Sequence, residues 1–259
     1  MSVCAIIPAA GRGTRLNADR PKLLTPLAGD RTVWDVLSGR LAPLVDQIHV
    51  VMSPDGKPQL EAALAEKPVG AKVTVGVQPT PLGMGDAIFA APEVFRAHDH
   101  VLIIWGDQAH VSADTLLRCK DAHLAATGDR CTLPLVSLAA PYVEYRFLPS
   151  GGLASVLQSR EGDRCMPGGL GDVGVFLLST AGLETAWSDF LDDALQGAVT
   201  GEVNFLPFLP FLSARGWRFQ PVIVDDANEA RGINTPDDLA FFRSIYAAAT
   251  GPQARSRER

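Results

Sequence analysis

Near its amino terminus the chain reads Val3-Cys4-Ala5-Ile6-Ile7-Pro8-Ala9-Ala10-Gly11-Arg12-Gly13-Thr14-Arg15. The run Val3–Ile7 is apolar without alternation, which is typical of a β-strand that is covered on both faces. The small residues that follow let backbone N–H groups approach a ligand closely and form a site for an anion. A buried strand that opens into such a turn predicts an α/β fold with a phosphate-binding loop after the first strand.

The same alternation of short apolar runs and helical segments continues through the first half of the chain. The predicted strands are Val3–Ile7, Ile48–Met52, Val73–Val77 and Val101–Trp105, and the predicted helices are Val33–Leu41, Pro58–Glu66, Asp86–Phe95 and Ala113–Ala126. This order predicts βαβ units and a Rossmann-like, mostly parallel mixed sheet flanked by helices.

The pattern changes after Leu138. Two alternating stretches, Tyr142–Leu148 and Leu153–Ser159, predict a small inserted β-hairpin region at about residues 140–175. The glycine-rich segment Glu161–Gly171 predicts a mobile loop. The remaining predicted elements are a strand over Val173–Leu178, helices over Ala181–Leu195 and Phe205–Ala214, a strand over Phe219–Val224 and a helix that begins at Thr235-Pro236. We expect one domain over residues 1–250 and a flexible tail over 251–259.

Composition narrows the class of protein. The formal net charge of −6 argues against a nucleic-acid scaffold, and no apolar run is long enough to span a membrane. The four cysteines are widely spaced and predict buried thiols rather than a disulfide framework. The start Met1–Cys4 lacks the basic region of a signal peptide, so we expect a cytoplasmic protein.

The loop after the first strand carries positive charge. Arg12 and Arg15 lie within it, and Lys22 follows a short way downstream. A dinucleotide-binding motif would need glycine at Leu16, and no P-loop motif occurs. A turn with solvated arginines is the plainer alternative, but the concentration of cations favours triphosphate binding.

The motif Ala9-Ala10-Gly11-x-Gly13-Thr14-Arg15 with Pro21-Lys22 downstream resembles the signature of sugar-1-phosphate nucleotidyltransferases. The similarity is closest to their N-acetylglucosamine-1-phosphate uridylyltransferase domain and extends over about residues 3–240. The resemblance implies that Gly11 and Gly13 bring the backbone to the phosphates, together with Ala9, Ala10 and Thr14. It also implies that Arg15 clamps the leaving pyrophosphate and that Lys22 neutralises the attacked α-phosphate and the incoming acceptor.

A second element runs from Gln78 to Ala87. A glutamine amide at the end of a strand offers a donor and an acceptor to the edge of a pyrimidine base, and Gly83 brings the backbone close to a ring. The family has a matching glutamine and an L-G-T-G-x-A element, in which Met84 replaces threonine. A turn with a surface glutamine is the alternative.

Trp105-Gly106-Asp107 follows the most hydrophobic strand. A carboxylate at the carboxyl end of a central strand, beside a phosphate loop, is a candidate Mg²⁺ ligand. The family has G-D in this role, with Gly106 beside the nucleotide. Glu229–Asn234 resembles the family's E-G-V-N element, which implies that Asn234 completes the metal site.

On the acceptor side the sequence departs from the family. Gln158 stands where a glutamate contacts sugar hydroxyls, Asp172 replaces an asparagine, and Tyr145 replaces a glycine. The acceptor is therefore open between a sugar 1-phosphate, another phosphorylated small molecule and a phosphonate.

The predicted function is transfer of NMP, with UMP favoured, from a nucleoside triphosphate to a phosphorylated acceptor, with release of pyrophosphate and Mg²⁺ as cofactor. A cytidylyl- or guanylyltransferase with a non-sugar acceptor, and a non-catalytic nucleotide-sensing subunit, remain as alternatives. Homo-oligomers are compatible with the sequence.

Overall fold

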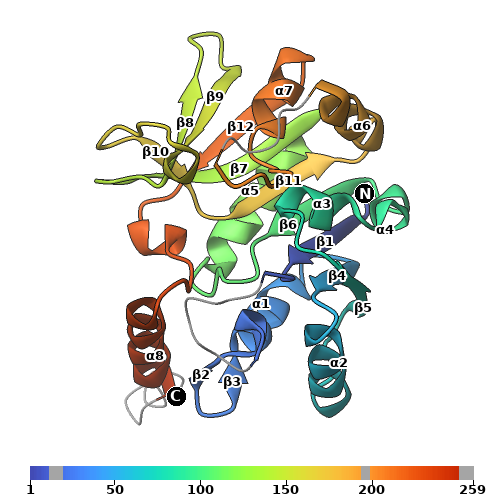
Figure 1. Ribbon diagram of the computed structural model, residues 1–259, viewed down its shortest axis with the longest axis vertical. Helices are drawn as coiled ribbons and strands as arrows, with labels where there is room; N and C mark the ends of the chain where they lie inside the picture. Colours follow the sequence, from blue (N-terminus) through green and yellow to red (C-terminus); the bar gives the residue numbers. More distant parts are fainter. Residues whose placement is uncertain (12–19, 194–198, 251–259) are drawn as a thin grey trace.

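A mixed sheet forms the centre of the computed structural model, which describes residues 1–11, 20–193 and 199–250. Within these ranges ten strands make up the sheet (Figure 1). They are β1 (Val3–Pro8), β4 (Gln47–Met52), β5 (Lys72–Val77), β6 (His100–Ile104), β7 (Arg130–Ser137), β8 (Val143–Phe147), β9 (Leu153–Gln158), β10 (Leu170–Asp172), β11 (Val175–Ser179) and β12 (Arg218–Ile223). A separate ribbon pairs β2 (Pro26–Ala28) with β3 (Arg31–Thr32).

The strand order divides the sheet into two parts. The order is β5-β4-β1-β6-β11-β7-β10-β8-β9, and β12 pairs with β7. The first four strands of this order are parallel, whereas β11 is antiparallel to both β6 and β7. The other antiparallel pairs join β7, β10, β8 and β9 in turn. Only β9, β10 and β11 run against the remaining described strands, so the predicted mostly parallel mixed sheet is confirmed.

Helices cover both faces of the sheet. One hydrophobic cluster contains residues of α1 (Val33–Leu41), α2 (Gly56–Glu66), α5 (Ala113–Ala125) and α8 (Pro236–Thr250); the other contains residues of α3 (Met84–Phe89), α4 (Pro92–Arg96), α6 (Leu183–Asp193) and α7 (Phe208–Ala214). In β1, Ala5 and Ile7 belong to the first cluster, and Cys4 and Ile6 belong to the second. Successive side chains of a strand point to opposite faces, which explains why the first strand is apolar throughout.

Most predicted elements are found, but one predicted helix is wrong. Asp86–Phe95 is not continuous: α3 ends at Phe89 and α4 begins at Pro92. Proline lacks an N–H group and disfavours a helical conformation of the residue before it. Ala91, which precedes Pro92, has the non-helical torsion angles φ −127° and ψ 66°. The break therefore lies where the proline requires it.

The sequence patterns did not identify β7, although this strand pairs with three others. Pro134 lies in its middle, which normally argues against a central strand. In the structure β11 pairs with Cys131 and Thr132, whereas β10 pairs with residues from Leu135 onward. Pro134 therefore occupies the point where one antiparallel neighbour ends and the other begins.

The predicted hairpin is confirmed as β8 and β9, which extend from one end of the molecule in Figure 1. The segment predicted as a loop over Glu161–Gly171 ends in β10 and begins with a 3₁₀ turn, η3 (Ser159–Glu161). Two further 3₁₀ turns are η2 (Lys22–Leu24) and η4 (Ala227–Ala230). The tail over 251–259 lies outside the described residues. In the parts of the chain that are described, no helix is long and apolar enough to cross a membrane.

Candidate active site

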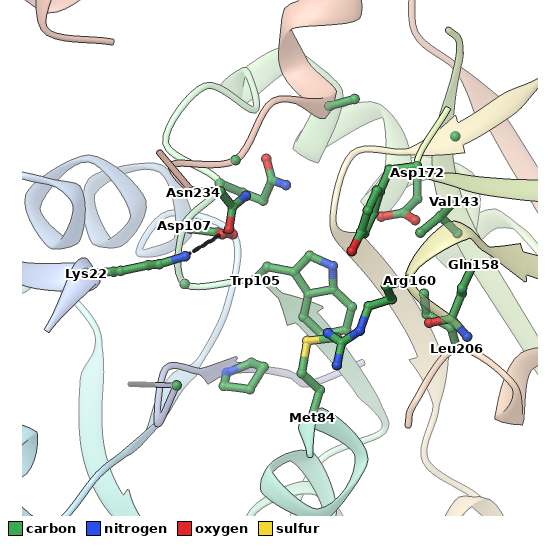
Figure 2. A pocket seen from close by; sticks show the side chains of 18 of the residues that line it. Lys22, Met84, Trp105, Asp107, Val143, Gln158, Arg160, Asp172, Leu206 and Asn234 are labelled. Carbon is green, nitrogen blue, oxygen red and sulfur yellow. Dashed lines mark hydrogen bonds and ion pairs between the residues drawn. The ribbon is translucent and has the colours of Figure 1, made fainter. Parts of the chain in front are cut away.

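A cavity of about 610 Å³ lies beside the carboxyl ends of β1 and β6 and extends to the hairpin. In Figure 2, Lys22, Asp107 and Asn234 lie at one end, and Gln158 and Asp172 lie at the other. The described lining residues are Pro8, Ala9, Gly11, Lys22, Leu23, Met84, Trp105, Gly106, Asp107, Gln108, Leu138, Tyr142, Val143, Gln158, Arg160, Gly171, Asp172, Glu202, Leu206, Ala230, Gly232 and Asn234. We call the first end the nucleotide end (Ala9, Gly11, Lys22, Gly106, Asp107, Asn234) and the second the acceptor end (Gln108, Tyr142, Gln158, Arg160, Asp172, Glu202).

The nucleotide end begins where two parallel strands stop side by side. The backbone N–H of Ala9 donates to Val51 O over 2.8 Å, which fixes the start of the loop after β1. Gly106, after β6, packs so closely that a Cβ atom there would lie 3.1 Å from Ala9 Cβ. Glycine at position 106 therefore lets the two strand ends approach, and it brings Asp107 next to the first loop.

Lys22 connects this pair of strands to the last part of the chain. Its Nζ donates to Asn234 Oδ1 over 2.9 Å and lies 3.5 Å from Asp107 Oδ2. Burial raises the pKa of the Asp107 carboxyl, and the charge of Lys22 opposes that rise. Buried Leu23 and Leu24 anchor η2, so the position of Lys22 is fixed by packing as well as by charge.

The turn that presents Asn234 is held by the start of α8. Asp238 Oδ2 accepts from the backbone N–H groups of Asn234 and Thr235, at 3.1 and 2.9 Å. In return, Thr235 Oγ1 accepts from Asp238 N over 3.2 Å, a reciprocal cap of the kind expected where Thr235 precedes the helix. A helix cap near the end of the described chain therefore fixes the backbone that presents the Asn234 amide.

Asp107 and Asn234 fit a magnesium ion. Mg²⁺ takes oxygen ligands, typically one or two from the protein, and completes its shell with phosphate and water. A Cβ atom at Gly232 would lie 3.0 Å from Asp107 Oδ2 and 3.1 Å from Asn234 Nδ2, so both side chains meet above a residue that has none. Lys22 contacts an oxygen of each, which shows that positive charge is accommodated there. Among the described residues no cluster of three or more His, Cys, Asp or Glu could hold a metal instead.

The second predicted nucleotide element packs against another segment of the protein. Gly83 has φ +127°, and a Cβ atom there would lie 2.5 Å from Val203 O. Val203 N donates to Leu82 O, and Gly85 N donates to Val203 O, at 2.7 and 3.0 Å. The glycines therefore permit a close backbone contact with the segment around Val203, and only Met84 of this element lines the cavity.

Gln78 is held by its neighbours in the chain. Its Nε2 donates to Asp86 Oδ2 over 2.7 Å and to Gly83 O over 3.0 Å. The side chain is buried and is not among the lining residues. The Gln78 amide, which we expected to contact a base, therefore stabilises the loop that leads into α3.

The acceptor end is built by the antiparallel part of the sheet. Asp172 lies at the end of β10 and lines the cavity, where it accepts from Tyr145 Oη over 2.9 Å and from Gly174 N over 2.7 Å. Tyr145 is buried behind Asp172 and is not a lining residue. Gln158 lines the cavity, and its Oε1 accepts from Asn204 Nδ2 over 3.2 Å.

Several lining residues were not identified from the sequence. Arg160 Nη2 donates to Glu202 Oε2 over 2.6 Å, and both side chains line the cavity near Gln158. Trp105, Gln108 and Gly232 also line the cavity. Trp105 directly precedes Gly106-Asp107, and Gly232 lies two residues before Asn234. Their closeness to these motifs in the sequence could therefore have identified them as lining residues. The Arg160–Glu202 pair carries no local signal.

The predicted site residues therefore fall into three groups. Ala9, Gly11, Lys22, Met84, Gly106, Asp107, Gln158, Asp172 and Asn234 line one cavity. Ala10, Gln78, Gly83 and Tyr145 do not line it. Gly13, Thr14 and Arg15 lie outside the described residues.

Two solved structures are similar in fold. HddC from Yersinia pseudotuberculosis is 18% identical, with a TM-score of 0.66 and coverage of 94% of this chain and 99% of the other. A putative glucose-1-phosphate thymidylyltransferase from Bacillus anthracis is 14% identical, with a TM-score of 0.72 and coverage of 95% and 96%. Both similarities place the fold among known α/β structures.

Curated relatives and a family model match the sequence itself. The bifunctional protein GlmU of Aquifex aeolicus is 26% identical over 252 residues, which cover 93% of this chain and 52% of the relative. GlmU of Acidithiobacillus ferrooxidans is 28% identical over 246 residues, with coverage of 93% and 51%. The chain thus spans about half the length of these relatives. A family model described as a MobA-like NTP transferase domain matches residues 5–166, and the chain belongs to this family.

Proposed function

We propose that this protein transfers a nucleotidyl group from a nucleoside triphosphate to a phosphorylated small-molecule acceptor and releases pyrophosphate. The observation that carries this proposal is the meeting of Lys22, Asp107 and Asn234 in a cavity that continues to the acceptor end. A cation and two oxygen ligands suit a polyphosphate with its metal, and the remaining volume suits a second substrate.

The reaction requires no general base. A phosphate oxygen of the acceptor, already ionised at neutral pH, forms a bond to the α-phosphorus. The bond between that phosphorus and the bridging oxygen breaks, and the electron pair leaves with pyrophosphate. Catalysis then rests on positioning and on neutralisation of charge, as in other phosphoryl transfers.

The residues divide these tasks. The backbone of Ala9–Gly11 faces the phosphates, and Lys22 neutralises charge between the α-phosphate and the acceptor. Asp107 and Asn234 hold Mg²⁺, which when bound supplies further neutralisation of the triphosphate. Arg15, outside the described residues, is proposed to bind the pyrophosphate portion.

The proposed donor is UTP, and the proposed acceptor class is a sugar 1-phosphate or a similar phosphorylated compound. The GlmU relatives and the solved structure titled a glucose-1-phosphate thymidylyltransferase support a pyrimidine nucleotide and a sugar phosphate. The Gln78 amide nitrogen donates to Asp86 and to the Gly83 carbonyl, and a contact of this side chain with the base stays a prediction.

The test is pyrophosphate release from UTP, dTTP, CTP, GTP and ATP, each with a series of sugar 1-phosphates and with and without Mg²⁺. We expect release that requires both Mg²⁺ and an acceptor, fastest with UTP. Nucleotide binding with no release under any combination would identify a nucleotide-sensing protein and contradict the proposal.

A further inference from the structure

The charges that line the cavity do not balance. Among the described lining residues, Asp107, Asp172 and Glu202 are acidic, and Lys22 and Arg160 are basic. Asp107 has Lys22 as its partner, and Glu202 has Arg160. Within residues 1–11, 20–193 and 199–250, Asp172 has no ion pair.

Asp172 has hydrogen-bonding capacity left. Each of its oxygens accepts one bond, from Tyr145 Oη and from Gly174 N, although a carboxylate offers about four acceptor positions. Burial raises the pKa of the Asp172 carboxyl, and within the described ranges no cation lies beside it to oppose that rise. Burial also raises the pKa of Tyr145, so its hydroxyl remains a donor. A positive charge in the cavity would remove the cost of ionising Asp172.

A second side chain with unused acceptor capacity lies near Asp172. Gln108 is 5% exposed and lines the cavity, and its Oε1 has no hydrogen-bond partner among the residues that the structure describes. The two side chains meet at Gly174: its N–H donates to Asp172, and a Cβ atom there would lie 2.6 Å from Gln108 Cγ and 2.9 Å from Gln108 Nε2. Buried polar atoms are normally satisfied, so the oxygen of Gln108 calls for a donor that the described residues do not supply.

The wall next to these acceptors is aromatic. A Cβ atom at Gly174 would also lie 2.6 Å from Trp105 Cδ1, and Trp105 lines the same cavity. Tyr142, which is half-exposed, lines it too. Aromatic faces attract cations, most strongly where water is excluded.

We propose that the acceptor carries a protonated amine as well as its phosphate, and that Asp172 and Gln108 bind the ammonium group. This inference rests on the proposed function, since it names the acceptor class of the same site. An ammonium supplies a positive charge for Asp172, N–H donors for its remaining acceptor positions and a donor for Gln108 Oε1. A neutral polyol supplies donors but no positive charge for Asp172.

The test compares acceptors that differ only at the amine. Glucosamine 1-phosphate is paired with glucose 1-phosphate, and phosphoethanolamine with 2-hydroxyethyl phosphate. Binding is measured by titration calorimetry on the full chain with UTP and Ca²⁺ present to slow turnover, and pyrophosphate release is measured in parallel with Mg²⁺. We expect the aminated member of at least one pair to bind roughly tenfold more tightly, the scale of a charged hydrogen bond.

Variants assign the preference to the two side chains. Asp172→Asn keeps an acceptor for Gly174 and removes the charge, so the preference for the amine should fall to about that of a neutral pair. Gln108→Leu leaves Asp172 in place and should reduce the preference several-fold, which keeps the test available if the first variant does not fold. Asp114→Asn, on the exposed first turn of α5, is the control and should keep it.

The inference is wrong if neither aminated compound binds more tightly than its counterpart, or if Asp172→Asn keeps the preference. Pyrophosphate release without an amine preference would overturn this inference alone. Absence of release from every nucleotide and acceptor would overturn the proposed function, whereas the calorimetric comparison would still decide the inference.

Discussion

The two ends of the cavity are built in different ways. At the nucleotide end, the charged groups are paired and lie where adjacent parallel strands stop. At the acceptor end, antiparallel strands and the segment around Glu202 supply the walls, and one carboxylate has no cation beside it in the described part of the chain. Among the described residues, the charged side chains at the nucleotide end thus have partners of opposite charge, whereas Asp172 at the acceptor end has none. The nucleotide end is marked by short sequence motifs, whereas the acceptor end is formed by contacts between segments that are distant in the sequence.

The largest effect is expected from Asp107→Ala. Loss of this carboxylate removes a proposed metal ligand and the partner of Lys22, so kcat should fall by roughly 10³-fold while the protein stays folded. Pyrophosphate release and a urea unfolding curve measure the two quantities. Asp114→Ala, which changes an exposed carboxylate, is the control. Turnover at the wild-type rate would remove Asp107 from the nucleotide end.

Lys22→Ala should lower kcat/KM by about 10²-fold, because an ammonium that contacts both Asp107 and Asn234 is lost. Lys22→Arg should not restore the rate, since a planar guanidinium does not replace a compact ammonium between two oxygens. Steady-state kinetics with UTP would show this, with Lys57→Ala, on the exposed side of α2, as control. Full activity of the arginine variant would mean that charge alone matters at this position.

The sheet that joins the two ends should weaken in acid. His123 is fully buried, and its pKa is lowered to about 3 by burial and by the charges of Arg130 and His100. It bonds Thr132 of β7 and His100 of β6 through its two ring nitrogens. An unfolded histidine has a pKa near 6.5, so this contribution to stability is complete above that pH and is lost as the pH falls toward 3.

At pH 5 the loss from His123 amounts to about 2 kcal/mol. Urea unfolding at pH 7.5, 6 and 5 measures it. In His123→Gln, unfolding at pH 5 should take up about one proton fewer than in the wild type. An unchanged pH dependence would show that His123 is not the group that titrates.

The smallest effect is expected at the acceptor end from Glu202→Gln. The Arg160–Glu202 pair is partly exposed, and such pairs contribute under about 1 kcal/mol. The KM for the acceptor should therefore change a few-fold, and the KM for the nucleotide should stay the same. Glu184→Gln, which breaks the exposed pair with Arg96 outside the cavity, is the control. An equal change in both KM values would show that Glu202 does not act on the acceptor alone, and it would contradict the division of the cavity into two ends.

Short-range patterns predicted the fold and much of the nucleotide end. The first strand, Lys22 and Asp107 carry local motifs, and the carboxyl ends of neighbouring parallel strands must lie together. That geometry explains why residues far apart in the sequence were expected in one cavity. The roles assigned to them stay predictions, as do the roles of Gly13, Thr14 and Arg15.

Long-range pairing explains what the sequence did not reveal. Pro134 argued against a strand at β7. The sequence did not show that β11 pairs with β7 before this residue and β10 pairs with it after this residue, because both strands come later in the chain. Gln78 was expected at a base, but Asp86 and the Gly83 carbonyl bind its amide. Arg160 and Glu202 meet only in the folded chain, and the unpartnered oxygen of Gln108 can be recognised only when its surroundings are known.

The segment Glu202–Asn204 contacts both the acceptor end of the cavity and the loop that leads into α3. Glu202 binds Arg160, Val203 pairs with Leu82 and Gly85, and Asn204 binds Gln158. A chimaera that exchanges the β8–β9 hairpin for that of a relative would replace Gln158, at the end of β9, and leave Asn204 without its present partner. Redesign of acceptor choice must therefore transplant residues 202–204 together with the hairpin, and the graft must keep a backbone that fits against Gly83.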